Sequence, residues 1–190
     1  MAIYPSDMQR LNRILTRATG GIADRYYQLP IDGGDPVYRE RVYCYELYHQ
    51  MRLRWPQHSE YSLNGEVDKA AHPQAALLEG ALKPDLLVHT PGNHAGNHAV
   101  IEVKSCRANA PAITIDLVKL VRLVRQFRYQ RAIYLIYGYQ AAQALERGHA
   151  AFEALENKVP IEVWLHEQPG QSAYRATTFT PAEEINLAGG

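Results

Sequence analysis

The chain has 190 residues, and twenty lysines and arginines balance twenty aspartates and glutamates, so its formal net charge is zero. Its 46% hydrophobic and 21% charged residues are typical of a globular domain. This composition excludes a disordered tail protein and a strongly basic nucleic-acid coat. No apolar run approaches the ~18 residues of a membrane span, and no signal peptide is visible. With two cysteines, the chain is expected to be cytoplasmic, without a membrane partner.

The first expected elements are helical. A capping pattern at the start and regularly spaced apolar residues predict a helix over 6–19, which two glycines then end. A second helical stretch is expected over 22–27. Together these segments would form a helical extension over 1–30.

The longest helix of the front half is expected after a loop over 29–34. Asp35 can cap it, and Pro36 suits the first helical position, where no backbone N–H is needed. The helix is predicted to continue to about Trp55. Glu46 lies within its apolar residues, and burying an unpaired carboxylate is costly, so this position needs a functional or an ion-pair explanation.

Strand-like segments follow in the middle of the chain. Residues 61–68 alternate roughly between apolar and polar side chains, and short apolar runs occur at 85–89 and 99–103. The last two runs flank a stretch rich in turn residues. They are therefore predicted to pair as a hairpin with a long connection.

The second half of the chain alternates between helices and strands. An amphipathic helix is predicted over 114–128 and a buried strand over 132–137. A helix over 141–157 follows, and then two strands over 161–166 and 174–179.

This order of elements predicts an α/β fold with an α+β-type mixed sheet flanked by helices. Residues 1–190 are expected to form a single domain. Its core would cover about 36–138, and a helix and strands over 139–180 would complete it at the C-terminal side.

Three charged residues lie close to the two middle strands. Asp85 opens the first, and Glu102 and Lys104 share one face of the second, because side chains alternate along a strand. If these strands pair, the two carboxylates and the ammonium can meet. Two carboxylates about 4 Å apart repel by roughly 4 kcal/mol at an effective dielectric near 20, and a divalent cation removes that repulsion. Oxygen ligands favour Mg²⁺ or Mn²⁺ over Zn²⁺.

Such a site suits phosphodiester hydrolysis. A water bound to the metal loses its proton more readily, and the lysine can hold that water or stabilise charge on the phosphate. Taken alone, Glu-Val-Lys is also a common surface tripeptide, and Pro-Asp can be a simple turn into a strand.

The pattern resembles the PD-(D/E)XK nuclease superfamily, which has the restriction-endonuclease-like fold. Pro84-Asp85 is similar to its PD element, and Glu102-Val103-Lys104 is similar to its ExK element. The surrounding words KPDLLVH and NHAVIEVKS resemble those of an uncharacterised bacterial subgroup. The resemblance covers about residues 36–138. It implies a core of helix, three mainly antiparallel strands, helix and strand.

The resemblance also implies roles for individual residues. Asp85, Glu102 and the backbone carbonyl of Val103 would be metal ligands, and Lys104 would position or activate water. Glu46 matches a place on the first core helix where many members supply an extra acid. The alternative for Glu46 is a salt bridge to an arginine.

The expected substrate is DNA, contacted by basic residues of the amphipathic helix. Lys119, Arg122 and Arg125 are candidates for phosphate contacts, although a solvated helix face or a surface pair of Lys119 with Asp116 is about equally compatible. Because the net charge is zero and no DNA-reading module is visible, target choice is expected from a partner protein, a homodimer or DNA structure.

Two functions therefore follow from the sequence. The first is a Mg²⁺- or Mn²⁺-dependent deoxyribonuclease in restriction or phage defence, repair or mobile-element processing. The second is a catalytically inactive nuclease-like subunit that binds nucleic acid or a partner protein. RNA as the ligand also remains open.

Overall fold

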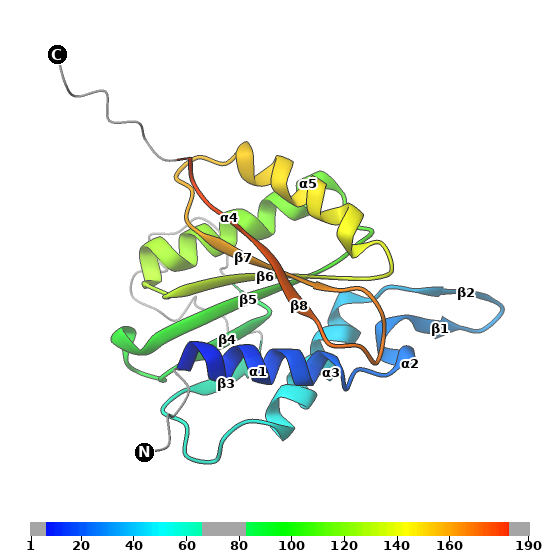
Figure 1. Cartoon of the computed structure of the whole chain (residues 1–190), viewed down its shortest axis with the longest axis horizontal. Helices are drawn as coiled ribbons and strands as arrows, with labels where there is room; N and C mark the ends of the chain where they lie inside the picture. The colour runs from blue at the N-terminus through cyan, green and yellow to red at the C-terminus, as the bar shows by residue number, and fades with distance from the viewer. Residues whose placement is uncertain (1–6, 66–82, 183–190) are drawn as a thin grey trace.

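The computed structural model describes residues 7–65 and 83–182. Two helices, a hairpin and a third helix come first, and a mixed sheet with two further helices follows (Figure 1). The helices are α1 (Asp7–Thr19), α2 (Asp24–Tyr27), α3 (Glu40–Leu53), α4 (Ala110–Phe127) and α5 (Ala141–Glu153). The strands are β1 (Leu29–Ile31), β2 (Gly34–Val37), β3 (Ser62–Gly65), β4 (Leu86–His89), β5 (Asn97–Ser105), β6 (Arg131–Tyr137), β7 (Ile161–His166) and β8 (Tyr174–Phe179).

A six-stranded mixed sheet forms the centre, with the strands in the order β3-β4-β5-β6-β7-β8. β3, β4 and β5 pair antiparallel, whereas β5, β6 and β7 run parallel and β8 returns antiparallel. The parallel pairs are joined by the crossover helices α4 and α5, as parallel strands require. The predicted mixed α/β fold is therefore confirmed.

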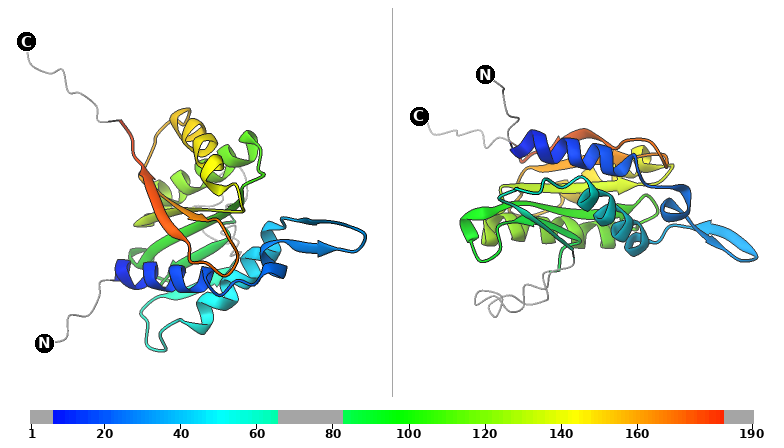
Figure 2. Two further views of the ribbon diagram at one scale, coloured as in Figure 1. Left: turned by 45° about the vertical axis from the view of Figure 1, so that its right-hand side comes forward. Right: turned by 90° about the horizontal axis from the view of Figure 1, so that it is seen from below.

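Helices cover both faces of this sheet (Figure 2). On one face α4 and α5 pack against residues such as Leu87, Val100 and Ile136. On the other face α1 and α3 pack against residues such as Leu86 and Ile101. β7, which was expected to be half-buried, is therefore almost wholly buried. Within the described ranges, none of the helices is long and apolar enough to cross a bilayer.

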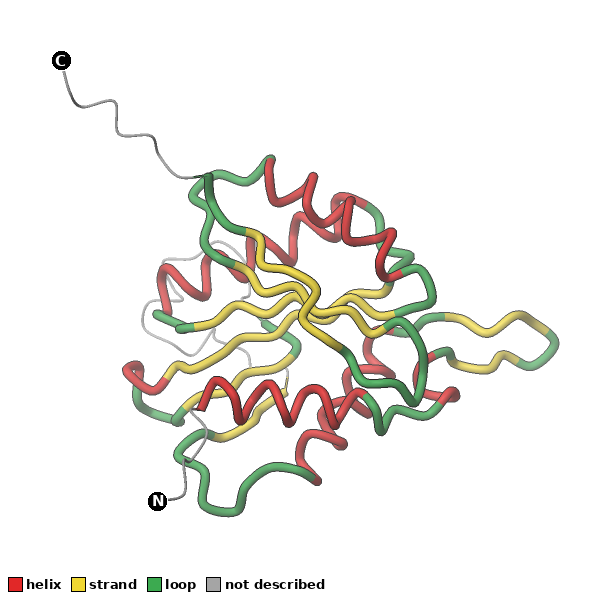
Figure 3. The backbone as a smooth tube through the Cα atoms, viewed as in Figure 1, coloured by secondary structure: helices red, strands yellow, loops and turns green. Residues whose placement is uncertain are grey.

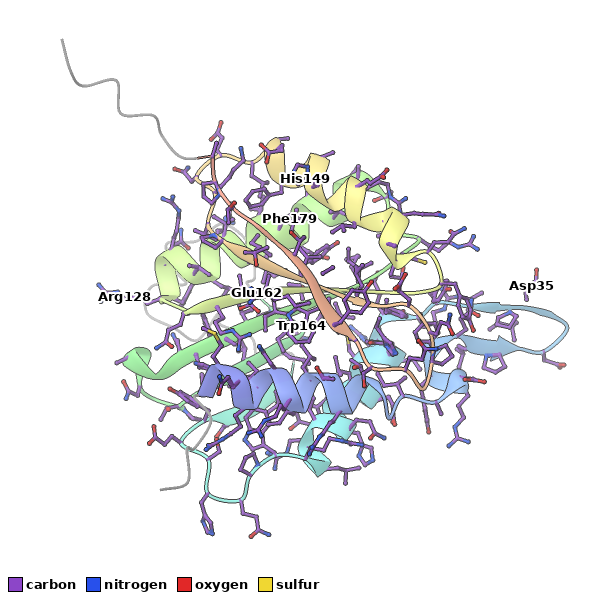
Figure 4. All side chains as sticks on the ribbon, viewed as in Figure 1. Asp35, Arg128, His149, Glu162, Trp164 and Phe179 are labelled. Atoms are coloured by element: carbon purple, nitrogen blue, oxygen red, sulfur yellow. The ribbon has the colours of Figure 1, made fainter. Side chains whose placement is uncertain are left out.

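The start of α3 differs from the sequence-based expectation. The segment around Asp35 and Pro36 is not a helix start but β2, which pairs with β1 in a hairpin that projects from the body (Figure 3). Asp35 lies on this hairpin (Figure 4). The turn uses Asp32-Gly33, a dipeptide typical of hairpins, with Gly33 at φ +71°. Proline is tolerated there because a two-stranded ribbon has only edge strands.

Helix α4 begins earlier than expected, at a defined cap. The Asn109 side chain accepts a hydrogen bond from the Ala112 N–H at 3.0 Å, and Pro111 occupies the first turn. The helix ends at Phe127, and its C-cap residue, Arg128, has a φ of 58° in the left-handed region.

The N-terminal helix is joined to the sheet by a buried arginine. Arg131 on β6 donates to both carboxylate oxygens of Glu162 on β7 at 2.8 Å, and its Nη2 donates to Asn12 of α1 at 2.6 Å. Figure 4 shows Glu162 and Trp164 on β7, the strand beside β8. Arg131, which continues the three-residue spacing of Arg122, Arg125 and Arg128, is therefore structural.

The remaining strand predictions agree with the structure. The hairpin of β4 and β5, the buried β6, and the pairing of β7 with β8 are confirmed. β3 covers the first part of the strand expected over 61–68, and residues 66–68 lie outside the described residues.

Candidate functional site

The hairpin of β4 and β5 brings the two predicted acids face to face. Leu86 pairs with Ile101, so Asp85, one residue earlier, lies across from Glu102. The Val103 N–H donates a hydrogen bond to Asp85 Oδ2 at 2.8 Å, which holds this carboxylate against β5. Glu102 and Lys104 share the face of β5 that α4 covers.

Two lysines and two further acids complete what we call the charged cluster: Glu40, Asp85, Glu102, Lys104, Asp116 and Lys119. Lys104 Nζ lies 3.0 Å from Glu40 Oε2 and 2.7 Å from Asp116 Oδ2. Lys119 Nζ lies 2.8 Å from Glu102 Oε2 and 3.4 Å from Asp116 Oδ1. The cluster thus combines four carboxylates with two ammonium groups.

Separate elements of the chain position these side chains. Asp116 and Lys119 are three residues apart on α4 and therefore lie on one face of the helix, the face turned to β5. Glu40 is the first residue of α3, where a carboxylate is favoured by the helix dipole. Its Oε1 accepts a hydrogen bond from the Ser105 N–H at 3.2 Å, which ties the start of α3 to the end of β5.

Burial in the cluster is graded. The Glu102 side chain is 1% exposed and Asp116 is 8% exposed, whereas Lys119 is 18% and Glu40 38% exposed. Solvent therefore reaches the cluster at Glu40 and Lys119, while Glu102 lies at its base.

This environment raises the pKa of both strand carboxyl groups. Burial is the largest cause for Glu102, and the charge of Asp85 raises its pKa further, although Lys119 counteracts both effects. Burial also raises the pKa of Asp85, while the Val103 hydrogen bond and the charge of Lys119 act in the opposite direction. A nearby positive charge therefore stabilises the ionised form of both carboxyl groups.

The two lysines stay charged in this setting. Burial acts to lower the pKa of Lys104, but its contacts with Asp116 and Glu40 outweigh burial and raise that pKa above the usual value. In the same way the pKa of Lys119 is raised by Glu102 and Asp116 in spite of burial. Neither lysine is therefore poised to act as a general base at neutral pH.

Asp85 and Glu102 are the residues of the cluster that could hold a divalent cation. Glu102 Oε1 is buried and has no hydrogen-bond partner among the residues that the structure describes, which is costly unless a ligand satisfies it. Within residues 7–65 and 83–182, no group of three or more His, Cys, Asp or Glu side chains is arranged to hold a metal. Mg²⁺ commonly binds through one or two carboxylates and keeps several waters, so Asp85 and Glu102 suit it.

Glu46 does not belong to this cluster. Its Oε1 accepts a hydrogen bond from Gln50 at 2.7 Å on α3. Glu46 follows Glu40 by six residues, which places it roughly 120° away around the helix. The acid that α3 brings to Lys104 is therefore Glu40, which the sequence analysis missed because it placed the helix start at Pro36.

The predicted basic residues separate into two groups. Lys119, expected on the outer face of α4, points instead into the charged cluster. Arg122 and Arg125 do lie on the outer face, where they line a hollow of about 650 Å³ together with Leu155 and Glu156 near the end of α5. Val103 contributes its N–H to Asp85, and a role of its carbonyl as a metal ligand stays a prediction.

Comparison of this chain with protein-family models, with curated proteins and with solved structures found no match.

Proposed function

We propose that the chain is a Mg²⁺- or Mn²⁺-dependent nuclease that hydrolyses phosphodiester bonds in DNA, and that it acts in the cytoplasm. The observation that carries the proposal is the convergence of Asp85 and Glu102, with an unpartnered buried oxygen on Glu102 and two lysines beside it. Two carboxylates and an ammonium around a hydrated metal supply what this reaction needs.

The order of elements supports the same proposal. From α3 to β6 the described helices and strands follow in the order helix, three strands, helix and strand, apart from the short 3-10 turn His94–Gly96, and β3, β4 and β5 are antiparallel neighbours. This is the order implied by the resemblance to the PD-(D/E)XK nucleases. Asp85, directly before β4, lies across from Glu102 on β5, and the resemblance implies such a position for the acids of the PD and ExK elements.

In the proposed mechanism, Asp85 and Glu102 would hold the cation. The bound cation would lower the pKa of a coordinated water and stabilise charge on the phosphate. Lys104 orients the attacking water or the phosphate oxygen, and Glu40 and Asp116 fix its ammonium in position. Lys119, whose Nζ lies 2.8 Å from Glu102 Oε2, would add a positive charge beside the negative charge of the phosphate.

Cleavage assays on DNA test this proposal. The purified protein is expected to cut DNA with Mg²⁺ or Mn²⁺ and to stop cutting with a chelator, and Lys104→Ala and Asp85→Asn are expected to abolish cleavage. Glu40→Gln should lower the rate, whereas Glu46→Gln, a matched change on the same helix, should not. Intact linear, circular, branched and single-stranded DNA after incubation with either metal would count against a nuclease.

A second candidate function is an inactive nuclease-like subunit that binds nucleic acid or a partner protein. It is favoured by one observation, namely that both lysines already contact carboxylates, which is also how a structural ion-pair network is built. Calorimetry with Mn²⁺ distinguishes the two functions. A nuclease site binds Mn²⁺ in the wild type and loses this binding in Asp85→Asn, whereas a structural network binds Mn²⁺ in neither protein.

A further inference from the structure

Helix α1 carries a row of arginines on the side of the molecule away from α4. Arg10, Arg13 and Arg17 are spaced by three and four residues, so they fall within about 60° of the helix circumference and cover about 10 Å of its length. Arg54, directly after α3, joins them around a groove of about 270 Å³. We call these four residues and the space between them the arginine groove.

The lining of this groove is basic. Ile14 and Pro56 complete it, so no acid is among its lining residues in the described part of the chain. Arg13 and Arg17 are exposed, and neither forms an ion pair with a carboxylate within residues 7–65 and 83–182. Like charges three and four residues apart destabilise a helix, so this row needs a compensating role.

One arginine is already held in place at the groove. Arg54 Nη1 donates to the Gln50 carbonyl oxygen at 2.9 Å and to Gln50 Oε1 at 2.6 Å, which restricts its guanidinium. A restricted guanidinium loses less conformational entropy when it binds an anion. Because its planar fork matches phosphate oxygens, arginine is the side chain best suited to phosphate.

We propose that the arginine groove binds the phosphate backbone of DNA as a second contact outside the charged cluster. The choice of DNA as the ligand rests on the proposed nuclease function. Next to the groove lies a second hollow, of about 420 Å³, lined by Arg52, Gln57, Ser59 and Ser62 among others. This basic and polar surface extends the path along which a backbone can lie.

Helix α3 links this groove to the charged cluster. Glu40 in the cluster is its first residue, and Arg54 in the groove follows its last. Fourteen positions at 1.5 Å each separate them by about 21 Å. That length corresponds to about six base pairs of B-DNA. The groove is too distant for chemistry and serves to retain DNA, which compensates for the zero net charge of the chain.

Salt-dependent DNA binding tests the inference. The probe is a fluorescein-labelled duplex of about two helical turns, or about 21 base pairs, measured by anisotropy in EDTA over a range of salt concentrations. Each phosphate contact contributes about 0.9 to the slope of log affinity against log salt. The variant Arg13→Gln/Arg17→Gln is therefore expected to bind more weakly, with a slope shallower by about 1.8.

The control removes two positive charges elsewhere. Arg25→Gln/Arg175→Gln changes two exposed arginines outside the groove and should leave the slope unchanged. Equal slopes for the wild type and the groove variant, equal losses in both variants, or no binding by the wild type at low salt would each overturn the inference. Since EDTA removes divalent cations, this assay does not depend on the proposed metal site. A wild-type protein that binds no Mn²⁺ in a separate titration would refute the nuclease proposal alone.

Discussion

The substitution Lys119→Met tests whether the charged cluster is built for a cation. Lys119 Nζ lies 2.8 Å from Glu102 Oε2, and the Glu102 side chain is 1% exposed. Methionine has a similar length and a good helix propensity, so the change removes the charge with little effect on α4. It leaves a buried carboxylate without its closest cation.

The expected loss of stability follows from that burial. Breaking a buried ion pair by removing one partner costs about 3 to 5 kcal/mol. A cation present at a concentration 100 times its Kd raises the free energy of unfolding by about 2.7 kcal/mol. The variant should gain more than the wild type, because no ammonium competes with the cation for Glu102. The stability gap between variant and wild type should therefore be widest in EDTA and narrow in Mn²⁺, by about 1.4 kcal/mol for each tenfold by which the variant binds Mn²⁺ tighter than the wild type.

Urea unfolding with and without Mn²⁺ measures this gap, and calorimetry measures Mn²⁺ affinity directly. Lys158→Met is the matched control, because Lys158 lies 3.5 Å from the exposed carboxylate of Glu153 and outside the cluster. The stability lost by Lys158→Met should stay below about 1 kcal/mol with or without the metal. If Lys119→Met loses the same stability in EDTA and in Mn²⁺, and binds Mn²⁺ no tighter than the wild type, the cluster is not a cation site.

Two further predictions concern stability. Arg131→Met should lower the free energy of unfolding in urea by about 3 to 5 kcal/mol, because it leaves the Glu162 carboxylate without its buried partner. Arg175 lies 3.6 Å from the same carboxylate but is 47% exposed, so Arg175→Met should cost under about 1 kcal/mol. Similar losses of stability in the two variants would contradict this difference in burial. Burial lowers the pKa of His166 from 6.5 to about 4, so the folded state takes up a proton less readily than the unfolded chain. The contribution of neutral His166 to the free energy of unfolding is therefore fully present above about pH 6.5, and about 3 kcal/mol of it is lost as the pH falls toward 4. His166→Gln should flatten the pH dependence of the urea midpoint. An unchanged profile in that variant would show that other groups control it.

The sequence alone was sufficient for features that depend on local periodicity. Side chains alternate along any strand, so Glu102 and Lys104 share a face if the strand predicted at 99–103 continues through Lys104. The turn-rich stretch before it then predicted the hairpin that places Asp85 across from Glu102. The mixed sheet flanked by helices followed from the order of elements in the same way.

Only the tertiary structure decided which other charged residues join Asp85, Glu102 and Lys104. Lys119 looked like a solvated residue of an amphipathic helix, but α4 lies across β5, and the buried Glu102 draws that ammonium inward. Glu40 rather than Glu46 reaches Lys104, because the two acids lie about 120° apart around α3 and the first residue of that helix lies against the end of β5. Periodicity specifies which side chains share a face of one element, whereas the partner of a charge is set by packing between elements that are distant in sequence.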